Sequence, residues 1–299
     1  MPHWKAILTY DGTPYNGWQV QPNQPTIQGT LAQAIHRITG ETVLPQGSGR
    51  TDTGVHALGQ VATFSLNVPI PAANLHHALN RALPASIRVL SVETVPPDFH
   101  ARHSALRKTY EYRIFPGNRI CSPMLAPFLW ACSFDLPLPA LQQAAAHILG
   151  THDFTSFAAS DPDLATRNKT REGESQPASF DAAYFAHLNS DLVNDAEAET
   201  TEANNSLQPA PDPNPPAHAT NVRTIYHSVW LQQNDVLIYR IIGSGFLHHM
   251  VRNLVGTFVE VGTGRIPADD IPAILATRNR SAAGPTAPAR GLFLIEVAY

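Results

Sequence analysis

The feature that most constrains the fold is a stretch of 60 residues, 161–220, that cannot contribute to a packed core. It contains seven prolines, includes the run PAPDPNPP at 209–216, and carries 11 acidic against three basic residues. Such a segment buries too little apolar surface to offset the conformational entropy lost when it becomes ordered. We therefore expect an exposed, flexible insertion, and the folded structure has to be built from the residues on either side of it.

Without this segment the chain changes the sign of its charge. The whole protein has a formal net charge of −4, whereas the residues outside 161–220 hold 17 basic and 13 acidic side chains. Arginine accounts for 17 of the 20 basic residues, and its planar guanidinium pairs with phosphate and stacks on bases. This balance permits an RNA partner, although an arginine-rich composition without functional meaning explains it equally well.

Several classes of protein do not fit the sequence. No 18 consecutive residues are apolar, and Asp11 precedes any apolar run that a secretory signal would need. Cys121 and Cys132 are too few for a disulfide framework and form no C-x-x-C pair. We expect a cytoplasmic protein without a membrane span.

The apolar spacing on either side of the insertion alternates between strand and helix periods. In the first part it predicts helices starting at Thr26 and spanning 72–82, and strands at 4–10, 42–46, 59–66, 87–95 and 106–115. In the second part it predicts helices at 138–149, 246–260 and 268–277, a strand pair at 222–243 with a turn at Asn234-Asp235, and a last strand at 291–298. These patterns predict an α+β fold with two α/β halves, 1–115 and 116–299, whose mostly antiparallel strands share a central sheet.

The run GRTDTGVHA at 49–57 is the first candidate site. It places the carboxylate of Asp52 in a loop bounded by two glycines, with Arg50 two residues before it and His56 four residues after it. Glycines allow a ligand to approach closely, and a nearby guanidinium keeps a carboxylate ionised and nucleophilic. On spacing alone, a polar turn with an Asp-Arg salt bridge is the more common explanation.

The strand RKTYEYRI at 107–114 is the second candidate. Its alternation places Tyr110, Tyr112 and Ile114 on one face. Tyrosines that face a cleft can stack on an extruded base. Tyrosines in a sheet are, however, more often core residues.

The third candidate is GFLHHMVRNLVG at 245–256. On a helical wheel an apolar stripe through Leu247, Met250 and Val251 opposes a face that carries His248, His249, Arg252 and Gly256. Arg252 would thus project from a helix whose other side is anchored in the core. A solvated basic face is an equally good reading. The histidine pairs lie near no cysteine and in no H-E-x-x-H motif, so we predict no metal site.

Together, these three segments resemble the tRNA pseudouridine synthase A family. GRTDTGVHA is similar to that family's catalytic loop, in which alanine usually stands at the position of Thr53. The other matching segments are YDGTPYNGWQ (10–19), DFHAR (98–102), RKTYEYRI, DFTSF (153–157), GFLHHMVRN (245–253) and RGLFL (290–294). The similarity covers nearly the whole chain except 161–220.

The resemblance implies a function and a fold. It implies the pseudouridine synthase fold, with a shared sheet around a basic cleft, and a homodimer that needs no cofactor. It implies isomerisation of uridine to pseudouridine at positions 38, 39 and 40 in the anticodon stem-loop of tRNA. The target base must leave the stack to expose its glycosidic bond.

The resemblance also implies the role of each site residue. Asp52 would be the nucleophile, attacking either the sugar or the pyrimidine ring, and Arg50 would occupy the space that the flipped base leaves or hold the RNA backbone. Tyr110 would stack on the uracil and could mediate removal of its C5 proton, and Arg252 would pair with Asp52. Leu292 would close the pocket with an apolar wall, next to a position where the family usually has an acidic residue and this chain has arginine.

Two other functions compete with this one. Asp52-Thr53-Gly54 is the D-T-G of aspartic proteases, but that mechanism needs two carboxylates that share a proton, and the sequence has no second D-T-G or D-S-G. A catalytically silent RNA-binding protein would keep the fold. It would have no need for an aspartate in a glycine-bounded loop with arginines around it.

Overall fold

The computed structural model describes residues 1–159 and 221–299. The predicted insertion at 161–220 therefore lies outside the described residues. Among those that are described, no helix is long and apolar enough to cross a membrane.

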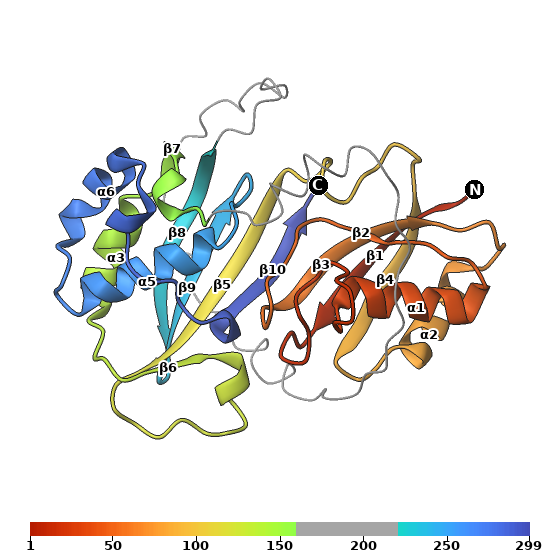
Figure 1. Ribbon diagram of the computed structural model, residues 1–299, viewed down its shortest axis with the longest axis horizontal. Helices are drawn as coiled ribbons and strands as arrows, with labels where there is room; N and C mark the ends of the chain where they lie inside the picture. Colours follow the sequence, from red (N-terminus) through yellow and green to blue (C-terminus); the bar gives the residue numbers. More distant parts are fainter. Residues whose placement is uncertain (160–220) are drawn as a thin grey trace.

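The described chain forms one large mixed sheet with helices packed at both of its ends (Figure 1). The strands are β1 (His3–Tyr10), β2 (Gln46–Gly47), β3 (His56–Ser65), β4 (Ile87–Val95), β5 (Arg107–Pro116), β6 (Trp130–Cys132), β7 (Gly150–Asp153), β8 (Val222–Gln233), β9 (Val236–Gly243) and β10 (Leu292–Ala298). The α-helices are α1 (Ile27–Thr39), α2 (Ala72–Ala82), α3 (Leu138–Ala146), α5 (Met250–Gly262) and α6 (Ile271–Thr277). Short 3₁₀ helices are η1 (Ala126–Phe128), η2 (Thr155–Phe157), η3 (Ala268–Asp270), η4 (Arg280–Ala282) and η5 (Ala289–Gly291).

The strand order of the sheet is β4-β1-β3-β10-β5-β9-β8-β7, with β2 added to β3 and β6 added to β5. Most neighbours are antiparallel, and only the β3/β10 and β5/β6 pairs of the described residues are parallel. The last strand, β10, thus lies between a strand of the N-terminal half and β5. The expected α+β fold with a shared, mostly antiparallel sheet is confirmed. The division of the chain at residue 115 stays a prediction.

Helix α1 illustrates how the local sequence sets an element. Thr26 caps its N-terminus by accepting a hydrogen bond from the N–H of Gly29, and Gly40 ends it in a left-handed conformation with φ 74°. Leu31 and Ile35, on its apolar stripe, are fully buried. Helix α2 packs beside α1 and against β4 at the same end of the sheet, while α3, α5 and α6 cover the other end (Figure 1).

One strand prediction and the end of one predicted helix need correction. The strand expected at 42–46 is reduced to β2, because Pro45 has no N–H and its carbonyl accepts a bond from Nε2 of Gln28 instead of a strand partner. Directly after the helix predicted at 138–149, Gly150 has φ 95° and begins β7, which pairs with β8. The helix itself ends at Ala146. Strands β6 and β7 had not been predicted.

Two helix predictions also need correction. The helix expected at 246–260 begins only at Met250, because His249 adopts a left-handed conformation with φ 58° that a helix cannot include. The helix expected at 268–277 is divided into η3 and α6, with Pro272 in the first turn of the latter. Gly256, assigned to the polar face of the wheel, is buried: a Cβ built on it would lie 1.6 Å from the carbonyl oxygen of Pro285. Helix α5 and the segment that contains Pro285 are therefore in direct backbone contact.

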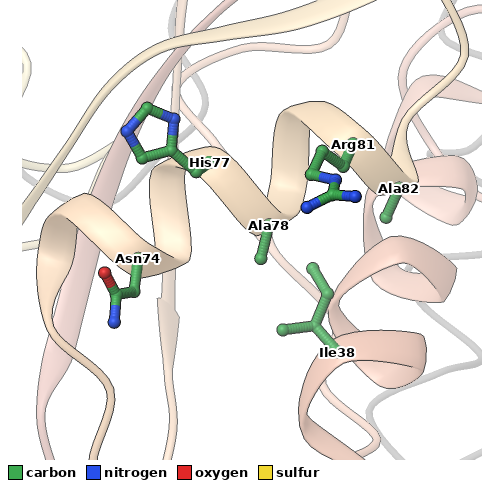
Figure 2. A pocket seen from close by; sticks show the side chains of 6 residues that line it. All are labelled: Ile38, Asn74, His77, Ala78, Arg81 and Ala82. Atoms are coloured by element: carbon green, nitrogen blue, oxygen red, sulfur yellow. The ribbon is translucent and has the colours of Figure 1, made fainter.

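A pocket opens between α1 and α2 (Figure 2). It is lined by Ile38, Asn74, His77, Ala78, Arg81 and Ala82. None of the predicted site residues belongs to it, so it is not the candidate site.

Candidate functional site

The loop that carries Asp52 connects β2 to β3 and is held by the segment 10–19. The carbonyl of Thr51 accepts a hydrogen bond from the N–H of Trp18 (2.9 Å), and its hydroxyl lies 2.8 Å from that of Tyr10. Gly12 packs so closely that an added Cβ would lie 2.0 Å from the carbonyl oxygen of Val55. The YDGTPYNGWQ motif is thus the support of the Asp52 loop.

His56, at the end of this loop, is a structural residue. Its side chain is buried and its ring stacks on that of Phe293, with centroids 4.7 Å apart. Nε2 donates to the carbonyl of Pro127 (3.1 Å), because a carbonyl can only accept, and Nδ1 accepts the N–H of Gly12 (3.0 Å). Both ring nitrogens are used for holding the loop against its neighbours.

Asp52 meets the segment that leads into α5, about 200 residues later in the chain. Arg252 donates from Nη1 to Oδ2 of Asp52 at 3.1 Å. Nε2 of His248 lies 3.5 Å from Oδ1, and Nε2 of His249 lies 3.3 Å from Oδ2. The aspartate side chain is 19% exposed, so it remains accessible from solvent while three nitrogen-bearing side chains surround it.

Arg252 is fixed at both ends of its guanidinium. Nε donates to the carbonyl of Ala287 at 2.7 Å, and the N–H of Ala287 donates in turn to the backbone carbonyl of Arg252. Its side chain is 15% exposed. Because one nitrogen is bound to the backbone, the other is held in a single direction, toward Asp52.

The two histidines precede α5 instead of lying within it, but they face Asp52 together with Arg252. Their rings are in contact, tilted by 32° with centroids 3.9 Å apart, and the backbone of His249 is left-handed. Burial lowers the pKa of His249, although the nearby Asp52 carboxylate opposes this change. The sequence shows that His248 and His249 are adjacent and close to Arg252. No pattern in the sequence indicates that these two histidines face the carboxylate of Asp52.

Tyr110 lies on β5, beside Asp52. Its ring makes an edge contact with that of Phe246 (centroids 5.0 Å apart) and is 8% exposed. Burial, and to a smaller extent the charge of Asp52, raises the pKa of the Tyr110 hydroxyl above its usual value. The phenol is therefore neutral at physiological pH.

The other two predicted site residues lie on the Asp52 loop and on β10. Arg50 is exposed on the Asp52 loop. Leu292 is buried at the start of β10, where the backbone is in register with Tyr112. The structure thus brings Asp52, Arg252 and Tyr110 together, keeps Arg50 on the same loop, and places Leu292 in the sheet.

Asp52, His248 and His249 also form a group that could hold a metal ion. One ligand atom from each lies within 4.8 Å of the other two. Arg252 already binds one carboxylate oxygen, so a cation would compete with a guanidinium for that oxygen. That this group holds no metal stays a prediction.

The arrangement as a whole offers one carboxylate, a fixed guanidinium and a neutral phenol on a partly open surface. Such a carboxylate can attack an electrophilic carbon. In the ranges that the structure describes, the ionic partners of Asp52 are Arg252, His248 and His249, none of which is a second carboxylate. The geometry therefore lacks the pair of acids that an aspartic protease needs.

Comparisons with known proteins find relatives that match along nearly the whole chain. The family model described as tRNA pseudouridine synthase matches residues 6–104 and 212–299. A tRNA pseudouridine synthase A of Solibacter usitatus is 40% identical over 99% of this chain and 98% of its own length. Those of Moorella thermoacetica and Acetivibrio thermocellus are 40% and 38% identical, over 100% and 99% of this chain and 100% and 98% of their own lengths.

Proposed function

This chain belongs to the tRNA pseudouridine synthase family and is an isomerase of uridine in tRNA, and we propose that it acts at positions 38, 39 and 40 of the anticodon stem-loop with Asp52 as nucleophile. The observation that carries the assignment of Asp52 is its pairing with Arg252 at 3.1 Å beside Tyr110. Residues from three separate parts of the chain meet at one accessible carboxylate.

Asp52 acts on a uridine that has left the base stack. In one route its carboxylate attacks C1′ of the ribose, the N1–C1′ bond breaks, and uracil leaves with the bonding electron pair. The base then turns, C5 forms a bond to C1′, and the carboxylate departs. Loss of the proton from C5 and gain of a proton at N1 complete an isomerisation in which no atom is added. In the alternative route the carboxylate first attacks the pyrimidine ring.

The neighbours of Asp52 take supporting roles. Arg252, anchored at Ala287, orients the carboxylate. Tyr110 provides an aromatic surface for the extruded uracil and a hydroxyl near its C5 proton, while the buried Leu292 supplies an apolar wall. Arg50, exposed on the same loop, occupies the position of the extruded base or holds the RNA backbone.

RNA binding, the homodimer and the cytoplasmic location belong to the same proposal. Filter binding with a tRNA transcript tests the first, and sedimentation equilibrium tests the second. Cell fractionation with an antibody to this protein tests the third.

The nucleophile assignment is tested with Asp52→Asn, which changes the size of the side chain very little. Pseudouridine formation should fall to background, because an amide cannot replace the carboxylate in attacking carbon. Binding of tRNA should survive, since affinity comes mainly from phosphate contacts spread over many residues. The measurements are tritium release from C5-labelled uridine in tRNA and a filter-binding isotherm at fixed salt.

Asp235→Asn is the matched control, because Asp235 pairs with Arg119 on an exposed turn. It should retain the wild-type rate. Turnover retained in Asp52→Asn would contradict the nucleophile role. Activity lost together with binding or folding would assign Asp52 and Arg252 a structural role.

The target positions are tested separately. Transcripts that carry a single uridine at position 38, 39 or 40, with cytidine at the other two, should each be modified. Transcripts with uridine only outside the anticodon stem-loop should not release tritium, and modification there would contradict the proposed site.

A further inference from the structure

Lys108 is a charged residue beside the site that the mechanism above does not use. It lies on β5, two residues before Tyr110, and its Nζ donates a hydrogen bond to the carbonyl of Ser48 at 2.6 Å. A Cβ built on Gly49 would lie 3.3 Å from this Nζ and 4.0 Å from the hydroxyl of Tyr110. The ammonium and the phenol therefore face the same point, where the Asp52 loop begins.

The ammonium group has donors to spare. It carries three N–H groups, of which one is used at Ser48. Within residues 1–159 and 221–299, Lys108 forms no ion pair with a carboxylate and no second hydrogen bond. A partly buried charge in this state costs free energy unless an anion joins it.

Two arginines increase this cost. Burial is the main cause that lowers the pKa of Lys108, and the charges of Arg102, in the DFHAR motif, and Arg223, at the start of β8, add to it. Together these causes bring the pKa to about 8. The side chain of Arg223 also approaches Gly245, whose added Cβ would lie 3.6 Å from its Nε. Lys108 thus lies at the Asp52 loop and Arg223 beside the segment that leads to His248 and His249, and the charges of Arg102 and Arg223 both act on Lys108.

Like charges that repel one another in the free protein favour the binding of an anion. A phosphodiester presents oxygen acceptors that match ammonium and guanidinium donors. The position beside Tyr110 and the Asp52 loop determines which phosphate can reach the cluster: one next to the nucleotide in the site.

We propose that Lys108, together with Arg102 and Arg223, forms a subsite that binds one backbone phosphate of the RNA adjacent to the target uridine. This inference rests on the proposed function, because it takes the RNA to be bound with its target nucleotide at Asp52. The contact positions the strand for extrusion of the base, and Lys108 is a substrate-binding residue.

The test is a double-mutant cycle, in which one change is made in the protein and the other in the RNA. Lys108→Met removes the charge and keeps a long unbranched side chain. The RNA is an anticodon stem-loop in which one phosphate at a time, on either side of the target uridine, is replaced by an uncharged methylphosphonate. Dissociation constants are measured by filter binding at several salt concentrations.

Lys108→Met should weaken binding of unmodified RNA about tenfold and reduce the slope of log K against log salt by about one. One methylphosphonate should weaken wild-type binding by a similar factor and have no further effect on Lys108→Met. Additive losses at every phosphate position would overturn the proposal. Arg81→Met, on α2 beside the pocket of Figure 2, is the matched control and should show additive losses.

Lys108→Arg supplies a second readout that does not depend on losing the charge. Anion binding needs the protonated amine, so wild-type affinity should fall as the pH rises from 7 to 9 through the lowered pKa of Lys108. The arginine variant stays charged over this range, and its affinity should stay constant. The groups that face Lys108 are Arg102 and Arg223, which stay protonated, and Tyr110, whose raised pKa keeps it neutral. Wild-type and Lys108→Arg affinities that change equally with pH would overturn the proposal.

These outcomes are separate from those that test the proposed function. If modification occurs at other uridines, the proposed positions are wrong, and the cycle is repeated on the RNA that is modified. If Asp52→Asn abolishes turnover while the methylphosphonate losses are additive, only the phosphate subsite is wrong.

Discussion

Nη1 of Arg252 lies 3.1 Å from Oδ2 of Asp52, whereas Nε of the same guanidinium is bound to the backbone of Ala287. The two bonds use the fork geometry of arginine, which a single ammonium cannot reproduce. Asp52 thus receives its orientation from a side chain that is itself held by the segment packed along α5.

Arg252→Lys should lower activity although it keeps the charge. A lysine can reach either Ala287 or Asp52 but cannot bind both in the same geometry, so the carboxylate loses its fixed orientation. We expect kcat to fall about tenfold to a hundredfold with little change in KM for tRNA. Steady-state tritium release measures both constants, and an unchanged kcat would show that the second hydrogen bond has no role in the reaction.

Arg50→Lys should also be damaging, for a different reason. If a planar guanidinium occupies the place of the extruded base, a flexible ammonium leaves that place unfilled. Single-turnover rates on folded tRNA should fall about tenfold, whereas Arg81→Lys on α2 should leave them unchanged. A wild-type rate in Arg50→Lys would contradict the role in base flipping.

His249→Gln should change the acid side of the pH profile. Burial lowers the pKa of His249, so the imidazole is neutral at pH 7 and becomes charged only below the usual range of histidine. A charged His249, 3.3 Å from Oδ2, would hold the Asp52 carboxylate in an ion pair and slow its attack. The loss of kcat/KM as the pH falls below about 6 should be smaller in the glutamine variant. Identical acid limbs in both proteins would exclude His249 as their cause.

Gly256→Ala should destabilise the protein. A methyl group at this position would lie 1.6 Å from the carbonyl oxygen of Pro285, and a backbone neighbour cannot move away as a flexible side chain can. We expect a loss of about 3 kcal/mol in the free energy of unfolding, measured by urea denaturation. Gly262→Ala, on the same helix, meets side-chain carbons of Leu136 and Leu141 and should change stability by less than about 1 kcal/mol.

Secondary structure was predictable where local interactions decide it. Thr26 and Gly40 delimit α1 by a side-chain cap and a left-handed glycine, and Asn234 turns β8 into β9 with φ 50°. The prediction failed at residues 42–46 and at 246–249. There, bonds from distant residues and the left-handed backbone of His249 replaced the pattern that apolar spacing alone suggests.

In the candidate site, too, some features follow from local sequence and others only from contacts between distant residues. The sequence by itself determined which residue types are present: one carboxylate in a glycine-bounded loop, a tyrosine in an alternating strand, and an arginine in a half-apolar segment, whose combination is typical of one family. Only the tertiary structure decided that His248 and His249 face Asp52, that His56 is a support of the loop, and that Lys108 reaches Ser48. Local sequence sets the conformation of a segment through bonds to near neighbours. Contacts between residues far apart in the chain depend on how β10 joins the two parts of the sheet, and no local pattern records that pairing.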